Sequence, residues 1–223
     1  MGNMHCLNGR VLKPELLDTV SPEEARASLA DLVRINRDWG GYSTLRRLVG
    51  EQIPADQPFS LLDVGAASGD MGREIRKARP LVKVTSLDYL ASHLAACDGT
   101  KVTGDAFHLP FAAKSFDYVF CSLFLHHFTD AEVVELLRGF GQLARRAVLV
   151  IDLLRDPMAY YFIPWTQWLF RWDPITVNDG AISVEAAFKP RELESLARQA
   201  GLKNPRARSY RPAYRIALSA AVD

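Results

Sequence analysis

The stretch LLDVGAASGDMGREI, residues 61–75, decides the fold of this chain. Four strand-like residues run into a turn of small residues, and the turn runs directly into a helical pattern. A strand, a small-residue turn and a helix in this order are typical of sites that hold a nucleotide-like ligand, because backbone N–H groups there approach the ligand closely. The open question is whether that ligand is a dinucleotide, a nucleoside triphosphate or something else.

The flanking sequence repeats this alternation of apolar runs and helical patterns. We expect strands at 60–64, 82–88, 101–105, 115–122 and 147–153, and helices at 70–78, 90–96 and 129–143. Strands that alternate with helices in this way form a doubly wound, mostly parallel α/β sheet with right-handed crossovers. The sequence therefore predicts a Rossmann-like architecture.

The end of the chain breaks the alternation. A helix at 189–201, closed by Gly201, is followed by strand patterns at 206–210 and 214–222 that only three residues separate. Three residues are too few for a parallel crossover, so these two strands pair antiparallel. They bring the expected sheet to seven strands.

Two further segments lie outside the core pattern. Residues 1–59 are expected to form an N-terminal helical cap on the domain at 60–223, within one structural domain. In the cap, residues 22–53 read as helical, with Ser21 and Glu24 as a capping box and a break at the paired glycines 40–41. Residues 154–188 leave the sheet pattern and are expected to form a helical insertion or lid before the last helix.

The turn at residues 65–69 does not fit phosphate-binding loops. A P-loop requires Gly-Lys-Ser/Thr where the helix begins, and this chain has Gly-Asp-Met at 69–71. A dinucleotide loop requires glycine where Ala67 and Asp70 stand. Asp63 and Asp70 flank the turn, and like charges at 4 Å repel by about 4 kcal/mol near a protein surface. The turn therefore favours a cationic ligand, such as S-adenosylmethionine (SAM), over a pyrophosphate.

Acidic residues also follow the next two expected strands. Asp88 closes the second strand, about twenty residues after the turn, where a carboxylate accepts hydrogen bonds from ribose hydroxyls. Tyr89 is placed to lie against adenine, and Asp105 with Ala106 follows the third strand, where a carboxylate can accept from the adenine amino group. All of these positions lie at the carboxyl ends of strands, where an open α/β sheet binds its ligand.

With these residues the chain resembles the class I SAM-dependent methyltransferases. The matching segments are LLDVGAASGD (61–70), VTSLDYL (84–90), GDAFHLPF (104–111) and SFDYVFCSLFLHHF (115–128). The resemblance implies SAM as the cofactor and the following residues as its contacts: Asp63, Gly65, Ala66, Gly69, Asp88, Tyr89, Asp105, Ala106 and Ser122. One departure is Ala67, where the family often has glycine; alanine costs ~1 kcal/mol if that position requires a positive φ.

A looser resemblance concerns the methyl acceptor. RINRDWGG (34–41) and NDGAISVEAAFKPREL (178–193) look like bacterial methyltransferases that act on phenolic polyketides. Between them lies an aromatic run, from which we select four candidate substrate contacts: Tyr160, Tyr161, Trp165 and Trp168. These side chains either line a pocket for a flat apolar substrate or pack as a core helix on the sheet.

Two histidines and two arginines are further candidates for the site. His126 and His127 follow the fourth strand on the ligand side, and a neutral imidazole there can accept a proton from a phenol. The alternative is that both belong to the scaffold. Arg34 and Arg37 either pair with the SAM carboxylate or form a solvated helix face.

Composition limits the partners. The chain has 223 residues with 27 basic and 26 acidic side chains, a net charge of +1, which argues against a general nucleic-acid partner. The three cysteines, at positions 6, 97 and 121, lack the spacing of a disulfide framework or a zinc site, so we expect no metal and a reduced, cytoplasmic protein. The longest apolar run, residues 159–170, is too short for stable membrane insertion. The sequence does not indicate an oligomeric state.

Together these observations predict a SAM-dependent methyltransferase that acts on a small, apolar acceptor, with a phenolic oxygen as the preferred nucleophile. Carbon methylation of a quinol-type ring is an alternative within the same enzyme class. A SAM-binding protein without turnover is the alternative from another class.

Overall fold

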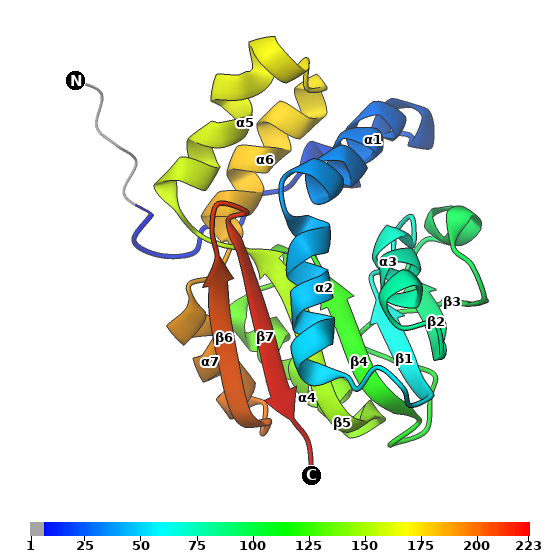
Figure 1. Ribbon diagram of the computed structural model, residues 1–223. Coiled ribbons are helices and arrows are strands. Elements are labelled where there is room, and N and C mark those ends of the chain that lie inside the picture. Colours follow the sequence, from blue (N-terminus) through cyan, green and yellow to red (C-terminus); the bar gives the residue numbers. More distant parts are fainter. Residues whose placement is uncertain (1–6) are drawn as a thin grey trace.

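A seven-stranded sheet forms the centre of the molecule (Figure 1), with the strand order β3-β2-β1-β4-β5-β7-β6. The computed structural model describes residues 7–223. The strands are β1 (Phe59–Val64), β2 (Val82–Asp88), β3 (Thr100–Thr103), β4 (Phe116–Ser122), β5 (Ala144–Leu153), β6 (Lys203–Tyr210) and β7 (Arg215–Ala221). Strands β1 to β5 are parallel, and β7 runs antiparallel to β5 and β6. The predicted Rossmann-like sheet and its terminal hairpin are confirmed.

Seven α-helices surround the sheet in the described residues. They are α1 (Pro22–Asp38), α2 (Gly41–Gln52), α3 (Asp70–Ala78), α4 (Asp130–Leu143), α5 (Pro157–Phe170), α6 (Pro174–Ala186) and α7 (Pro190–Gln199). Three short 3-10 helices join them, η1 (Leu16–Asp18), η2 (His93–Ala96) and η3 (Leu125–His127). The capping boxes of Ser21 with Glu24 and of Thr129 with Glu132 are both formed, as is the left-handed Gly201 after α7.

The predicted helix at 90–96 is wrong, because only the 3-10 turn η2 forms there. Side chains take the backbone groups that an α-helix would use. The Asp88 carboxylate accepts from the backbone N–H of Leu90, while Arg73 and Lys101 donate to the carbonyls of Ala96 and Ala95. Such side-chain bonds compete with helix formation in a segment this short.

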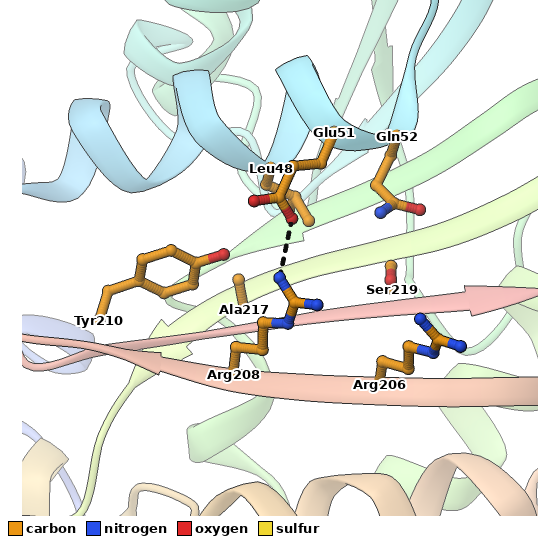
Figure 2. Close-up of a pocket in the computed structure, with 8 residues that line it drawn as sticks. All are labelled: Leu48, Glu51, Gln52, Arg206, Arg208, Tyr210, Ala217 and Ser219. Atoms are coloured by element: carbon orange, nitrogen blue, oxygen red, sulfur yellow. Dashed lines mark hydrogen bonds and ion pairs between the residues drawn. The ribbon is translucent and has the colours of Figure 1, made fainter.

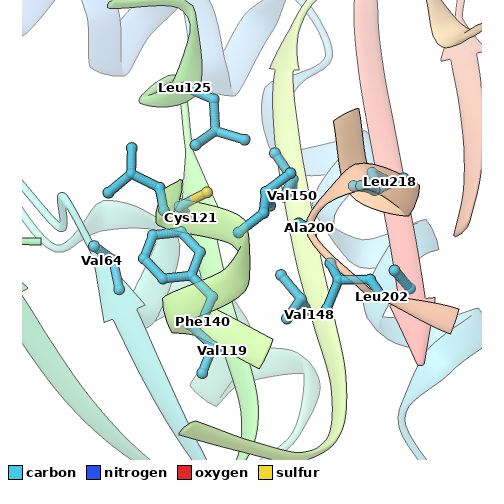
Figure 3. Close-up of a cluster of buried hydrophobic side chains, with 14 of the residues drawn as sticks. Val64, Val119, Cys121, Leu125, Phe140, Val148, Val150, Ala200, Leu202 and Leu218 are labelled. Carbon is cyan, nitrogen blue, oxygen red and sulfur yellow. The ribbon is translucent and has the colours of Figure 1, made fainter. Parts of the chain in front are cut away.

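Helices cover both faces of the sheet and bury two apolar cores. Helices α2 and α3 pack on one face, against side chains such as Leu61, Phe120 and Leu149. Helices α4 and α7 pack on the other face, where Phe140 lies among the apolar side chains of β4 and β5 (Figure 3). The central strands β1, β4, β5 and β7 contribute alternate residues to the two cores, as expected of a sheet that is buried on both faces.

Helices α5 and α6 form a third group with α1, beyond the carboxyl ends of the parallel strands (Figure 1). This group contains the expected insertion at 154–188, which is helical as predicted. Within the described residues, no helix is long and apolar enough to cross a bilayer. Cys97 and Cys121 are buried free thiols, and Cys6 lies outside the described residues.

Candidate functional site

The turn between β1 and α3 adopts a backbone that requires small residues. Gly65 and Gly69 both have positive φ angles, +68° and +67°. A Cβ on Gly65 would lie 2.5 Å from the Phe124 ring, and one on Gly69 would lie 2.6 Å from the Cys97 sulfur. The turn therefore packs against neighbouring loops at the carboxyl edge of the sheet, and glycine is required for both conformation and space.

Ala67 lies between these glycines with φ +44°. The sequence left open whether this position requires the left-handed region, and the structure shows that it does. The Ala67 backbone N–H donates to Asp88 Oδ2 at 2.9 Å, which holds the turn to the end of β2. Asp88 Oδ1 accepts from the backbone N–H of Leu90 and lies 3.1 Å from the His93 ring nitrogen. Asp88 thus positions the turn.

Three carboxyl groups, those of Asp63, Asp70 and Asp88, surround the turn. Asp63 at the end of β1 is 2% exposed, and its Oδ2 has no hydrogen-bond partner among the described residues. Burial, followed by the negative charge of Asp70, raises the pKa of Asp63 to about 8. A cation bound near this cluster would offset the repulsion between the acids, whereas a phosphate would add to it.

Asp70 at the start of α3 is held by the N-terminal helices. Its Oδ2 accepts from the Tyr42 hydroxyl at 3.0 Å and from Asn36 Nδ2 at 3.4 Å. The sequence did not reveal the roles of Asn36 and Tyr42, because nothing local shows that they reach Asp70. The side chains of Arg34 and Arg37 bind other groups. Arg34 donates to the Phe170 carbonyl, and Arg37 forms an ion pair with Asp38.

The predicted adenine contacts lie at the ends of β2 and β3. Tyr89 is 75% exposed, so its ring is open to a planar ligand. Asp105 Oδ1 accepts from the Phe107 backbone N–H at 2.9 Å, and Oδ2 lies 2.9 Å from the ring of His108, which is exposed. These contacts orient the Asp105 carboxylate and lower its pKa, the His108 bond most, so the group is an acceptor at neutral pH.

The buried polar atoms without partners fit a polar ligand at this edge. Besides Asp63 Oδ2, they include Ser122 Oγ at the end of β4 and Asn36 Oδ1 in α1. Buried polar groups are rarely left unsatisfied, and several in one region indicate a missing partner. Together with Ala66, which is buried beside the turn, these residues fit the amino acid and sugar groups of SAM.

His126 and His127 lie in η3, just beyond β4, in different surroundings. His126 is 3% exposed, and its Nδ1 lies 2.6 Å from Asp152 Oδ1. Burial opposes its charge, but Asp152 outweighs burial and raises the pKa of His126. His127 is more open, and burial and then the charge of His126 lower its pKa to about 3. The more accessible of the two imidazoles is therefore neutral at physiological pH.

Two acids beside these histidines were not predicted. Asp152 ends β5, and Glu15 precedes η1 with its Oε1 3.7 Å from His126 Nε2 and 3.9 Å from His127 Nδ1. Asp152 carried a usable signal, since it is an acid at the carboxyl end of the strand next to β4. Glu15 carried none, because it is more than a hundred residues from the histidines in a segment without a motif.

The aromatic side chains of α5 do not form a core helix, since none of its residues is fully buried. Trp165 and Trp168 are 63% and 80% exposed, and Tyr161 stacks on Trp165 at a centroid distance of 5.0 Å. Tyr160 packs edge-on against Tyr161. The four predicted substrate contacts thus share one exposed helix beyond the strand ends.

Two open hollows of the fold lie away from the turn. One of about 50 Å³ lies between α2 and the β6–β7 hairpin (Figure 2), where Arg208 pairs with Glu51. A second of about 380 Å³ adjoins it near the start of β5. Neither shares a residue with the turn or with the predicted substrate contacts, so neither is a candidate for the methyl acceptor.

Known proteins match parts of this chain in sequence and in fold. Residues 62–147 match the family described as a methyltransferase domain. A demethylmenaquinone methyltransferase of Thermotoga maritima is 29% identical over 151 residues, 65% of this chain and 66% of that protein. One of Deinococcus radiodurans is 26% identical over 143 residues, 58% of this chain and 57% of that protein. The matched part of the chain spans less than two thirds of each relative.

Solved structures share the fold. A Nostoc punctiforme protein described as a candidate O-methyltransferase aligns with TM-score 0.65 and 21% identity, over 96% of this chain and 64% of that one. Human N-acetylserotonin methyltransferase in complex with SAM aligns with TM-score 0.58 and 18% identity, over 84% of this chain and 54% of that one. With the acid-flanked turn and the ordered motifs at the strand ends, these matches support the resemblance to class I SAM-dependent methyltransferases.

Proposed function

We propose that this chain transfers the methyl group of SAM to a hydroxyl oxygen of a small, apolar, aromatic acceptor. The observation that supports this class of acceptor is a wall of aromatic side chains beyond the strand ends, formed by Trp39, Phe162 and Phe170. Trp39 of α1 packs edge-on against Phe162 and Phe170 of α5, at centroid distances of 4.7 and 5.0 Å. Aromatic surfaces of this kind favour flat, apolar ligands through burial and ring stacking.

The cofactor residues have distinct roles in this proposal. Asp88 accepts from the ribose hydroxyls, Tyr89 lies against adenine, and Asp105 accepts from the adenine amino group. The turn from Gly65 to Gly69 gives the amino acid part of SAM close access to backbone and to the flanking carboxyl groups. SAM supplies an electrophilic methyl group on a positively charged sulfur.

The reaction needs little beyond position and removal of one proton. The phenolic oxygen forms a bond to the methyl carbon as the carbon–sulfur bond breaks, and the electron pair remains on sulfur. The phenolic proton passes to a base, for which the two histidines beyond β4 are the candidates: His127 is the more accessible, and His126, whose pKa is raised, is the stronger base. Holding the oxygen about 3–3.5 Å from the methyl carbon in a dry site supplies much of the acceleration.

The remaining expectations become part of the proposal. Residues 1–59 act as a cap over the cofactor, and residues 154–188 act as a lid that selects the acceptor. The contacts of Trp39 with α5 support this division, since they join cap and lid on the ligand side. We propose a cytoplasmic enzyme with a small-molecule acceptor, without a nucleic-acid partner and without stable membrane insertion.

A second candidate is methylation of a ring carbon in a quinol. It is favoured by the names of the two curated relatives, both demethylmenaquinone methyltransferases. A quinol activates its own ring carbon, so this reaction depends less on a protein base than transfer to oxygen does. The same aromatic wall suits both acceptors.

One assay separates these possibilities. The protein is incubated with methyl-labelled SAM and a panel of phenols and ring-deuterated quinols, and products are analysed by mass spectrometry. Methyl transfer with full retention of ring deuterium supports the oxygen acceptor, whereas loss of one deuterium per methyl group supports the carbon acceptor. Tight binding of SAM without any product across the panel would support a binding protein without turnover.

A further inference from the structure

We propose that Glu15, His126 and His127 form a binding site for a divalent transition-metal ion, with Asp152 orienting His126. This site replaces the expectation of no metal that the cysteine spacing suggested, and it does not depend on the identity of the methyl acceptor. It lies where the N-terminal segment meets η3. The argument rests on ligand geometry, on the support behind each ligand, and on the preferences of metal ions.

The three side chains bring one ligand atom each close together. Their ligand atoms all lie within 4.8 Å of one another. Glu15 Oε1 is 3.7 Å from His126 Nε2 and 3.9 Å from His127 Nδ1. In a tetrahedral zinc site with ligands at ~2.1 Å, neighbouring ligand atoms are ~3.4 Å apart. Both Glu15 distances exceed this spacing by a few tenths of an ångström, and the two histidine nitrogens, within 4.8 Å of each other, would have to approach by up to about 1.4 Å to close the site around a metal ion.

Asp152 gives His126 the support typical of a metal ligand. The His126 Nδ1 lies 2.6 Å from Asp152 Oδ1, and the His126 backbone N–H donates to Asp152 Oδ2 at 3.3 Å. With its proton on Nδ1, the ring presents the Nε2 lone pair toward Glu15. Metal-binding histidines almost always have such a carboxylate or carbonyl partner on the second nitrogen. The His127 ring lies at a 31° tilt to that of His126, with centroids 4.3 Å apart.

Helix α6 also holds Glu15 in place. Its Oε1 accepts from Ser183 Oγ of α6 at 2.5 Å. Asp179, one turn earlier in α6, accepts from the backbone N–H groups of Leu16 and Leu17 and so fixes η1. The carboxylate therefore reaches the histidines from a backbone that α6 already orders, which lowers the entropy lost when a ligand binds.

The ligand set selects the kind of metal ion. Two imidazoles and one carboxylate suit zinc, cobalt and iron, whereas magnesium and calcium prefer oxygen ligands. Three protein ligands leave one position for water or for an oxygen of a bound molecule. The competing explanation is a proton: a protonated His126 between Glu15 and Asp152 would also satisfy both carboxylates.

Cobalt(II) titration of the metal-free protein distinguishes the two explanations. The background for all samples is a His5→Ala/Cys6→Ser variant, so that no ligand comes from residues 1–6. We expect one equivalent of cobalt to give the strong visible absorption of a tetrahedral site, and zinc to displace it. His127→Ala, at the most exposed of the three positions, should weaken cobalt binding at least tenfold, and so should Glu15→Gln.

His108→Ala is the matched control, because His108 is also next to an aspartate but lies outside the cluster. It should bind cobalt like the background protein. Thermal unfolding provides a second readout: one equivalent of zinc should raise Tm in the background protein and in His108→Ala, and not in His127→Ala. Absence of stoichiometric binding, or equal binding by His127→Ala and the background protein, would overturn the proposal and leave the proton as the explanation.

Discussion

The buried carboxyl group of Asp63 predicts that SAM binding releases a proton. Burial and the neighbouring charge of Asp70 raise the pKa of Asp63 to about 8, so about nine tenths of the molecules carry a proton there at pH 7. A cationic ligand near the turn would stabilise the carboxylate and lower this pKa. The proton then leaves as the ligand binds.

The size of the effect follows from linkage. If the bound complex holds Asp63 fully ionised, binding at pH 7 releases about 0.9 proton, and affinity falls on the order of a hundredfold between pH 9 and pH 6. Most of the decline should fall below the pKa of about 8, where protonation of the free protein competes with the cation. S-adenosylhomocysteine, which lacks the sulfonium charge, should release fewer protons than SAM.

Calorimetry measures this directly. SAM is titrated into the protein at pH 7 in two buffers of different ionisation enthalpy, and the difference in binding enthalpy counts the protons. Asp63→Asn is the matched variant, because it keeps the shape of the side chain and cannot titrate, while the ligand's own ionisation contributes equally to both proteins. Equal proton release and equal pH profiles for the two proteins would refute this reasoning.

Stability supplies an independent check with a defined sign. The pKa of Asp63 is raised from its ordinary 3.8 to about 8, so the folded protein binds more protons than the unfolded chain between these values. The stability from this group is present at pH 4 and is lost as pH rises through 8. In thermal unfolding, the Tm of Asp63→Asn should rise relative to that of the wild type as the pH increases from 4 to 9. An unchanged difference in Tm across that range would contradict the assigned pKa.

Three further predictions concern the rest of the site. Asp88→Ala should weaken SAM binding at least tenfold by calorimetry, because it removes both the ribose acceptor and the bond that holds the turn; unchanged affinity would place the ribose elsewhere. Trp165→Ala with Trp168→Ala should lower kcat/KM for the acceptor in steady-state assays while SAM affinity persists, and a larger loss in SAM binding would make α5 a cofactor lid. His127→Gln should lower kcat by about 10²–10⁴ with SAM binding intact if it is the base, whereas His126→Gln should mainly lower Tm, because it leaves Asp152 buried without its partner; rates within a few-fold of wild type for both variants would assign both histidines to the scaffold.

Local sequence was enough to predict the sheet. Apolar runs of four to eight residues between turn residues specify buried parallel strands, and the short link at residues 211–214 requires the antiparallel ending. The capping boxes mark the starts of α1 and α4 for the same reason, since the two residues of each box are only three positions apart in the sequence. The segment after Asp88 was predicted wrongly because its backbone groups bind side chains from outside the segment.

The residues of the site were likewise predicted only where local sequence specifies their position. Asp63, Asp88 and Asp105 were found because the ends of parallel strands meet at one edge of the sheet, so that sequence order implies spatial order. Asn36 and Glu15 reach the site from segments before the first strand, and their partners are 34 and more than a hundred residues away. No periodicity or spacing reports such contacts, since they depend on how α1 and η1 pack against the finished sheet.

The arrangement around the turn explains why this site suits a cation. Asp88 is satisfied by backbone N–H groups, and Asp70 is satisfied by Tyr42 and Asn36. Asp63 alone has a carboxylate oxygen without a partner, and its raised pKa shows that it keeps its proton instead. A phosphate would have to bind against the carboxyl groups of Asp70 and Asp88 and would gain nothing from Asp63. A ligand with positive charge gains from all three, because it lets Asp63 ionise without leaving a buried charge uncompensated.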